Sequence, residues 1–460
     1  MLLKKRITQL CLPLFAVFLL SACNSDDNNS TPLPPTPPPI QLSSFKVIHA
    51  VSDAPNVKID GGPAVQVNGL PFAQSTAKYS VPSGDATIAV DALLPNNATA
   101  RVIGPATLNL LPTQTYAVFA VGLAANSSIQ ALVVNQPVAA LASGNARVQV
   151  VHAAASAPTV DVHVTAPDAA LSSGTVTATL AFKQFSGALT VPAADYRVRI
   201  TLPGQPATVV FDSGRISLAS GNDLTVAAIN NRFAGPSPVS LLAVDANGNV
   251  SDIKDSKTTA DVRVVHAVSD APAVDILLNN TKAIPGLEFP DFTGYANLVP
   301  GAYNVKVAAA ADNSVVVINA DLNLTAGNFY TVLATGSLGQ NTITPLVLAD
   351  NPRRIATAAQ IRLVHGSTLA GNVDIYVTAN SDISTASPAF SNVPFKAETG
   401  YVSLMPGSYV VTVTPTGTKT AAIGPLRLEL AGNKIYTAVA RDGAARTAPL
   451  GLIVLDDFNN

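Results

Sequence analysis

The chain has 460 residues, a formal net charge of −2 and 12% charged residues, whereas ordinary globular domains have about 25%. This charge balance lacks the basic excess that binding to nucleic acid requires, so nucleic acid is not an expected partner. Apolar residues make up 48% of the chain and tryptophan is absent, so the core must be built from valine, alanine, leucine and isoleucine. The length suits several domains.

The segment 1–22 has the pattern of a secretory signal peptide. Lys4, Lys5 and Arg6 form a basic start, and a short apolar stretch continues to about Leu20. This stretch is well below the roughly 20 residues of a membrane-spanning helix, so we expect a cleaved signal without a transmembrane anchor. The closing Leu-Ser-Ala-Cys resembles the lipobox of bacterial lipoproteins. That resemblance implies a lipid on the thiol of Cys23 and cleavage of the chain before it.

Cys23 is expected to be the first residue of the mature protein and its only cysteine. Removal of the segment 1–22 also removes Cys11 and three basic residues, which leaves 24 Lys and Arg against 29 Asp and Glu, a net charge of −5. Without an internal disulfide, the domains must be stable from core burial alone. By resemblance to Gram-negative lipoprotein sorting, Asn24 after the palmitate-bearing cysteine implies the outer membrane of a Gram-negative cell envelope.

Residues 23–44 form the lipidated cysteine and a tether. The sequence from Asn24 onward is polar and then rich in proline, with too little apolar surface to pack as a domain. We therefore expect a disordered segment. If it extends like polyproline, it can hold the first domain up to roughly 60 Å from the lipid.

A motif of two apolar residues and a histidine occurs four times and marks four copies of one unit. Apolar residues follow each histidine eight and ten positions later, which is the alternation of a β-strand after a turn. Every copy then has a proline-containing turn and further apolar strands. Several short strands in about 100 residues, without helical periodicity, predict an all-β fold of tandem immunoglobulin-like β-sandwiches. The recurring histidines are His49, His152, His266 and His365.

The four copies are predicted to form two pairs. The recurring histidines of alternate copies are 217 and 213 residues apart in the sequence, whereas those of neighbouring copies are 103, 114 and 99 residues apart. Copies one and three share the segment HAVSDAP, and copies two and four share a VTA segment followed by an insertion rich in serine and threonine. A duplicated pair with a polar hinge explains both patterns. The predicted sandwiches cover residues 45–140, 145–247, 261–352 and 358–460, with the hinge at 248–260.

These repeats resemble the domain of unknown function 4397 family, which occurs as tandem copies in bacterial envelope and secreted proteins. The resemblance rests on the VVHAxxDAPxVD opening, the PGxYxV turn and the GxxYTV strand, and it extends from about Phe45 to the C-terminus. Copy three matches best, whereas copies two and four have Ser156 and Leu369 at the position of Asp270. The resemblance implies an envelope β-domain and no activity.

Copies one and three have an aspartate four positions after the histidine, which makes these residues candidates for catalysis or metal binding. Two copies lack this aspartate, and no copy has a serine or cysteine nucleophile at a recurring position, so the repeats predict no catalytic triad. The favoured interpretation is structural, with each histidine capping the first strand and bonding to turn backbone. His163 has no counterpart in the other copies and is expected at the surface.

No metal or cofactor site is predicted. Five histidines scattered along the chain do not form a zinc signature. The segment 245–255 superficially resembles a calcium loop, but its glycine comes too early and no glutamate closes it, so a solvated hinge is the favoured interpretation.

The leading functional hypothesis is a non-enzymatic envelope lipoprotein that is anchored to the membrane through Cys23. Its sandwiches would display surfaces to an envelope protein or polysaccharide, or scaffold an envelope complex. The alternative is an envelope hydrolase with a site at the histidine-bearing edges between paired modules. An enzyme requires His49 or His266 to meet acids or hydroxyls of the partner module in one pocket.

Overall fold

The computed structural model describes residues 40–63, 65–138 and 140–458. Within these residues the regular elements are β-strands and two short 3-10 helices, η1 (Pro95–Asn97) and η2 (Ser173–Thr175). No helix in the described part of the chain has the length and apolar character to cross a membrane. The predicted signal peptide, Cys23 and the tether up to residue 39 lie outside the described residues. The end of the predicted tether is wrong, because residues 42–44 belong to the first strand of the fold and pair with residues 80–82.

The strands form eight sheets, two for each predicted copy, which confirms the prediction of an all-β fold of tandem sandwiches. We number the sandwiches as modules 1 to 4. In each module the strand that ends on the recurring histidine lies in the first sheet and pairs in parallel with one later strand. All other pairings within the modules are antiparallel. The repeated sequence motifs therefore encode one repeated topology.

Modules 1 and 2 make up the first pair. In spatial order, the first sheet of module 1 contains β4 (Tyr79–Pro82), β1 (Leu42–His49), β7 (Gln114–Val121) and β8 (Gln130–Pro137), and the second contains β3 (Gln66–Leu70), β2 (Val57–Asp60), β5 (Gly84–Leu93) and β6 (Thr99–Leu110). Module 2 has five strands in its first sheet, β12 (Leu189–Pro192), β9 (Asn145–His152), β15 (Asp223–Asn230), β16 (Val239–Asp245) and β17 (Val250–Ile253), and four in its second, β11 (Ala178–Leu180), β10 (Val160–Thr165), β13 (Ala194–Leu202) and β14 (Gln205–Leu218).

Modules 3 and 4 make up the second pair, and each has two four-stranded sheets. The first sheet of module 3 contains, in spatial order, β21 (Ala296–Leu298), β18 (Ala260–His266), β24 (Phe329–Thr335) and β25 (Thr344–Asp350). Its second sheet contains β20 (Thr281–Leu287), β19 (Val274–Leu278), β22 (Gly301–Ala309) and β23 (Asp312–Leu324). The first sheet of module 4 contains β29 (Val402–Leu404), β26 (Ala359–His365), β32 (Lys434–Gly443) and β33 (Thr447–Asp457). Its second sheet contains β28 (Phe390–Val393), β27 (Val373–Thr378), β30 (Gly407–Pro415) and β31 (Ile423–Leu430).

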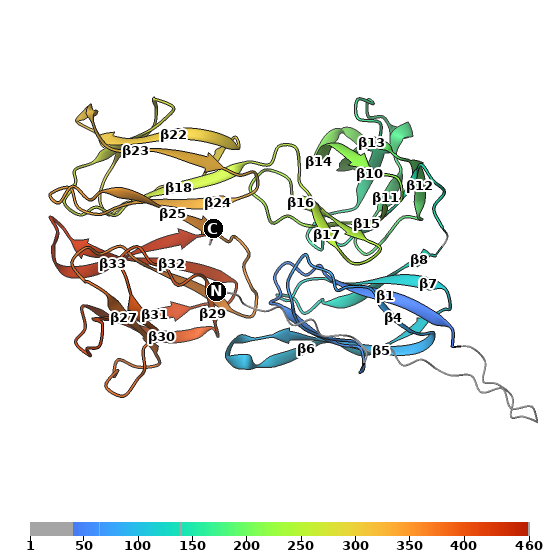
Figure 1. Cartoon of the computed structure of the whole chain (residues 1–460), viewed down its shortest axis with the longest axis horizontal. Coiled ribbons are helices and arrows are strands. Elements are labelled where there is room, and N and C mark those ends of the chain that lie inside the picture. Colours follow the sequence, from blue (N-terminus) through green and yellow to red (C-terminus); the bar gives the residue numbers. More distant parts are fainter. Residues whose placement is uncertain (1–39, 64, 139, 459–460) are drawn as a thin grey trace, which may run out of the picture. The chain divides into compact units, whose positions relative to one another are not determined.

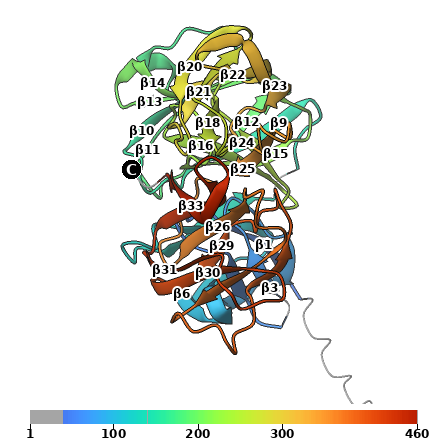
Figure 2. The same cartoon turned by 90° about the vertical axis from the view of Figure 1, so that its left-hand side faces the viewer.

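The two sheets of each module face each other as layers. Figure 1 shows β22 and β23 of module 3 in one layer and β18, β24 and β25 in the other. Figure 2 shows the same arrangement in module 4, where β26, β29 and β33 lie on one side of β30 and β31. Alternate side chains of every strand therefore point into the space between two sheets, as in other sandwiches.

The space between the sheets is filled differently in one module. Buried apolar side chains form one connected cluster in module 1, one in module 2 and one in module 4. In module 3 they form two separate clusters, one around Ile276, Val307 and Ile318 and another around Val262 and Leu324. The core of module 3 is thus interrupted along the length of the sandwich.

Further apolar clusters join the modules in pairs. Ile48 and Phe119 of module 1 pack with Ile229 and Leu242 of module 2, and all four side chains are fully buried. A second cluster joins residues of module 3 with residues of module 4. Among the described residues, neither of these clusters contains residues of both pairs, in agreement with the predicted two-by-two arrangement. The members of the second cluster are Val265, Ala267, Leu333, Leu348, Val364, Val439, Ile453 and Leu455.

The interface between modules 3 and 4 also contains buried charges. Arg362 pairs with Asp350 at 2.5 Å, and Arg263 pairs with Asp457, with each of the four side chains at most 1% exposed. Arg263 and Arg362 both lie three positions before a recurring histidine. The equivalent residue of module 1 is Lys46, whose ammonium group donates to the carbonyl oxygen of Asp245 at 2.6 Å.

The segment predicted to be a hinge is partly built into module 2. Residues 250–253 form β17, which pairs with β16 and extends the first sheet by one strand. Val250 and Ile253 are half-buried, so the apolar residues of this otherwise polar segment contact the module. The remainder, from Lys254 to Thr259, connects β17 to β18 of module 3.

Contacts between the two pairs include hydrogen bonds to backbone carbonyl oxygens. Arg353, in the connection between β25 and β26, donates to the carbonyl oxygens of Ser52 and Ala54 in module 1 and lies 5.0 Å from the centre of the Phe72 ring. The amide of Ala356 also donates to a carbonyl oxygen of module 1 at 2.8 Å. These contacts differ in character from the apolar interface within each pair.

Candidate functional site

The four recurring histidines occupy the same place, a buried corner where the first strand of each module ends. Their exposed fractions are 0%, 1%, 1% and 2% in modules 1 to 4. In each, Nε2 lies within 3.1 Å of the backbone carbonyl oxygen six positions later. Because a carbonyl oxygen can only accept, Nε2 carries the proton. In His49 and His266 the other nitrogen, Nδ1, accepts a backbone N–H at 3.3 Å.

A phenylalanine completes each corner, with its ring edge-on to the imidazole at 6.1 to 6.3 Å between ring centres. Sequence analysis missed this residue, although a positional signal exists. The phenylalanine follows the histidine at an offset of 23 in modules 1 and 3 and at an offset of 30 in modules 2 and 4. The difference again groups one with three and two with four. The residues are Phe72, Phe182, Phe289 and Phe395.

Burial favours the neutral form of the imidazoles of His49, His266 and His365. It lowers the pKa of His49 from 6.5 to about 4, although the hydrogen bond to Pro55 opposes the shift. Burial also lowers the pKa of His266 and of His365. With both nitrogens directed at backbone, the neutral rings of His49 and His266 have no free position for a substrate or a metal ion. In His152 and His365, Nδ1 is buried and has no hydrogen-bond partner among the described residues.

The aspartates that follow the histidines do not contact them through hydrogen bonds. The Asp53 carboxylate accepts the amides of Ala124 and Ala125 at 2.8 and 2.9 Å. The Asp270 carboxylate accepts the amides of Leu338 and Gly339 and the Ser337 hydroxyl. Each carboxylate therefore ties the turn after the first strand to the loop after β7 or β24.

Modules 2 and 4 make the same tie in the opposite direction. Asn230 accepts the amide of Ser156 at 3.2 Å, and Asp442 accepts the amides of Thr368 and Leu369. Here the acceptor lies at the end of the later strand instead of in the first turn. The loss of the aspartate from copies two and four is thus compensated within the same turn, which gives this carboxylate a structural role in every module that has it.

Two further residues singled out in the sequence, His163 and Asp245, form hydrogen bonds within module 2. His163 was expected at the surface, but it is 1% exposed, and its nitrogens contact the hydroxyls of Thr175 and Thr201 at 2.9 and 3.1 Å. That expectation is wrong because the insertion containing η2 covers the ring. Asp245 accepts the amides of Asn247 and Asn249 in the turn between β16 and β17. Across the described residues, no group of three or more His, Cys, Asp or Glu side chains is placed to hold a metal ion.

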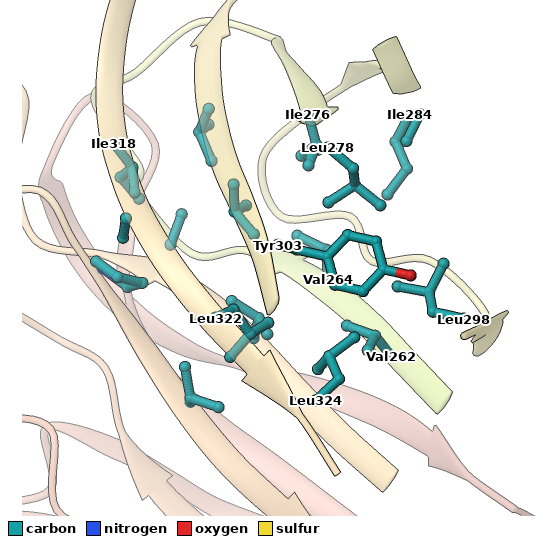
Figure 3. Close-up of a pocket in the computed structure, with 18 of the residues that line it drawn as sticks. Val262, Val264, Ile276, Leu278, Ile284, Leu298, Tyr303, Ile318, Leu322 and Leu324 are labelled. Carbon is teal, nitrogen blue, oxygen red and sulfur yellow. The ribbon is translucent and has the colours of Figure 1, made fainter. Parts of the chain in front are cut away.

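An apolar cavity lies between the two sheets of module 3, where its core is interrupted (Figure 3). Its volume is about 150 Å³. The side chains around it come from both sheets, as Figure 3 shows for Val262 and Val264 of β18 and for Leu322 and Leu324 of β23. At about 24 cal/mol per Å³, an empty cavity of this size costs about 3 to 4 kcal/mol of stability.

The equivalent space of module 2 is almost closed, with a volume of about 30 Å³. Two differences account for this. First, Phe211 of module 2 and Ile318 of module 3 occupy equivalent positions in their second sheets. In both modules the tenth residue after the histidine pairs with a residue of the next strand in the sheet, and that residue pairs with Phe211 or Ile318. In addition, β17 places Ile253 against the end of the sandwich, and module 3 has no strand in this position.

The sequence profile described as "Domain of unknown function (DUF4397)" matches residues 43–163, 260–376 and 377–460. The first two segments begin at 43 and 260, so their offset equals the one that separates His49 from His266. No curated protein matches the chain.

Two solved structures are similar to parts of the chain. "The Bacillus anthracis TIE protein" is 11% identical over 87% of this chain and 68% of its own, with a TM-score of 0.15. A structure titled "Alpha-glucan recognition by family 41 carbohydrate-binding modules from streptococcal virulence factors" is 8% identical over 44% of this chain and 99% of its own, with a TM-score of 0.16. At these TM-scores neither structure informs the function.

Proposed function

The chain belongs to the domain of unknown function (DUF4397) family, which has no assigned activity, so we propose its function from its residues and geometry. We propose that it is a non-enzymatic, lipid-anchored protein of the cell envelope whose paired β-sandwiches display surfaces that bind a partner. One observation carries the non-enzymatic part of this proposal. The recurring histidines and carboxylates bond to backbone, and the histidines are almost fully buried.

The hydrolase alternative requires a histidine that faces a pocket shared by two modules. His49 and His266 meet this requirement poorly, because their nitrogens contact backbone of their own turns. A general base must also reach the proton that it removes, within about 3 Å or through one water. Repeated burial of the same ring in four modules supports a shared structural task.

The paired architecture supports display. Buried apolar clusters join module 1 to module 2 and module 3 to module 4, so each pair is held by a packed core instead of a flexible linker. A packed interface keeps the outer surfaces of a pair in a constant relation, which reduces the entropy lost when both surfaces bind one partner. We propose an envelope protein or polysaccharide as that partner.

The non-enzymatic proposal is tested with isolated cell-envelope material, treated or untreated with protease, and the purified full chain. A binding protein is expected to sediment with the envelope and to release no soluble fragments. Protease treatment separates a protein partner, whose binding it removes, from a polysaccharide partner. Release of soluble fragments that stops in His49→Ala, while the variant remains folded, would overturn the proposal.

The anchor is tested by metabolic labelling with palmitate. We expect label on the wild-type protein and none on Cys23→Ser, because only a thiol can form the thioether. Cys11→Ser is the matched control, since it removes the other cysteine and should keep full labelling. Equal labelling of wild type and Cys23→Ser would disprove lipid attachment at this residue. Fractionation of Asn24→Asp tests the outer-membrane location, because the aspartate is expected to retain the protein at the inner membrane.

A further inference from the structure

We propose that the cavity of module 3 is a binding site for a small uncharged apolar molecule, about the size of a single hydrocarbon ring. This inference rests on the proposed function as a binding protein and names one of its ligands by class. The cavity has a volume of about 150 Å³. Apolar protein cavities of about this volume stay free of water and accept benzene-sized molecules.

The cavity results from particular small side chains, as the register of the four modules shows. In each module, the residue four positions before the recurring histidine pairs with a residue of the antiparallel edge strand. This pair is Phe45 and Tyr79 in module 1, Val148 and Leu189 in module 2, Val262 and Ala296 in module 3, and Ile361 and Val402 in module 4. Module 3 has the smallest pair of the four.

Module 1 shows what larger residues do at this position. The Phe45 and Tyr79 rings lie 6.0 Å apart, and both belong to the continuous core of that module. Val262 and Ala296 both line the cavity of module 3 instead. Modules 1 and 3 are otherwise the more similar copies, with the same HAVSDAP segment and the same carboxylate tie. The small pair at this position therefore distinguishes module 3 from the other modules.

The cavity has an accessible edge. Ala296 is exposed, and Val347 on β25 is 43% exposed, although both line the cavity. In module 2, Leu241 and Ala243 have the same register as Pro345 and Val347, and both are at most 3% exposed because β17 pairs beside them. Module 3 lacks such a strand, so a molecule can enter between the sheets at this edge.

The lining determines the class of ligand. It consists of Val, Ile, Leu, Ala and Pro side chains with one tyrosine ring and one carboxylate. The Tyr303 hydroxyl donates to the carbonyl oxygen of Val299 at 2.8 Å, and the Asp321 carboxylate accepts from Asn304. Both polar groups thus already have hydrogen-bond partners within the protein. A sugar or a charged molecule would lose its hydration here without gaining hydrogen bonds, which costs several kcal/mol.

The experiment uses the full mature chain with ¹³C-labelled Ile, Leu and Val methyl groups, titrated with toluene. We expect saturable shifts of methyl signals from Val262, Ile276 and Ile318, and a rise in the unfolding temperature of module 3 with toluene concentration. Ala296→Leu, which copies module 2, should weaken toluene binding at least about tenfold, because single methylene changes in apolar pockets already have effects of about 10-fold or more.

Two further variants keep the result interpretable. Val299→Leu adds one carbon to a side chain that is 74% exposed on the same segment, and it should leave toluene binding unchanged. Ile318→Phe copies Phe211 of module 2 and should also abolish binding while the methyl spectrum remains that of a folded protein. Absence of saturable shifts in module 3, or equal binding by wild type and Ala296→Leu, would overturn the inference. Either result leaves the palmitate and envelope assays unaffected, so the two proposals fail separately.

Discussion

Modules 1 and 3 share their corners but differ in the filling between their sheets. Both contain the buried histidine, the edge-on phenylalanine and the carboxylate tie at matching positions. At the other end of the sandwich, two aromatic rings in module 1 replace a valine and an alanine in module 3. The comparison teaches that the motif defining the repeat specifies a turn, whereas the volume of the core depends on residues outside the motif.

Exchange of the core pair of module 1 for that of module 3 is expected to have the largest effect on stability. Phe45→Val combined with Tyr79→Ala gives module 1 the pair found in module 3 and should cost about 3 to 5 kcal/mol, because buried side chains are lost and a cavity remains. Denaturant unfolding measures the loss, and methyl shifts in module 1 on addition of toluene should reveal a new site. The reverse exchange, Val262→Phe with Ala296→Tyr, is the control and should close the cavity of module 3. A loss below about 1 kcal/mol in the first variant would show that the rings do not support the core.

Acid should weaken the corners of both modules. The folded-state pKa of His49 is about 4, below the ordinary 6.5, so the unfolded chain takes up a proton that the folded state resists. Stability from this residue is complete above pH 6.5 and is lost as the pH falls toward 4, by about 3 kcal/mol in total. The pKa of His266 is lowered in the same direction.

Urea unfolding of wild type and His49→Gln at pH 7, 5.5 and 4 tests this pH dependence. Carboxylates also lose stabilising bonds in acid, so the difference between the two proteins isolates the histidine. We expect that difference to shrink as the pH falls. A difference independent of pH would contradict the assignment of a buried neutral ring.

Removal of a single corner should have a smaller effect. We expect His266→Ala and His49→Ala each to lower the free energy of unfolding by about 1 to 3 kcal/mol, because backbone groups lose a buried partner. Gln340→Ala, which alters an exposed side chain of module 3, should change stability by less than about 0.5 kcal/mol. A His266→Ala variant with unchanged unfolding but no toluene or envelope binding would indicate a functional histidine.

Several features of the fold and the corners could be predicted from the sequence because they are encoded locally. The alternation after each histidine predicts strands, and the offsets of 217 and 213 between alternate histidines predict the pairs. Backbone bonding of the histidines follows from the turn residues beside them. The corner phenylalanines were missed only because their offset differs between alternate copies.

Other features depend on neighbours that are distant in the sequence. The segment around β17 is polar, and its role as a fifth strand depends on a free edge at β16. The same applies to the buried pair of Arg362 and Asp350, because charged side chains are normally expected at the surface unless a partner is known. His163 is buried for a similar reason, since Thr201, which bonds to its ring, lies 38 positions later on the neighbouring strand β13.

The sequence by itself determined that this protein is a series of four related β-sandwiches in two pairs, since periodicity and turn residues act over short distances. Only the tertiary structure decided which sandwich has a cavity. Val262 and Ala296 meet across two strands that are separated by all of the β19 and β20 hairpin, and Ile318 faces them from the other sheet. The volume left between the sheets is set by all of these side chains together, so no single segment specifies it.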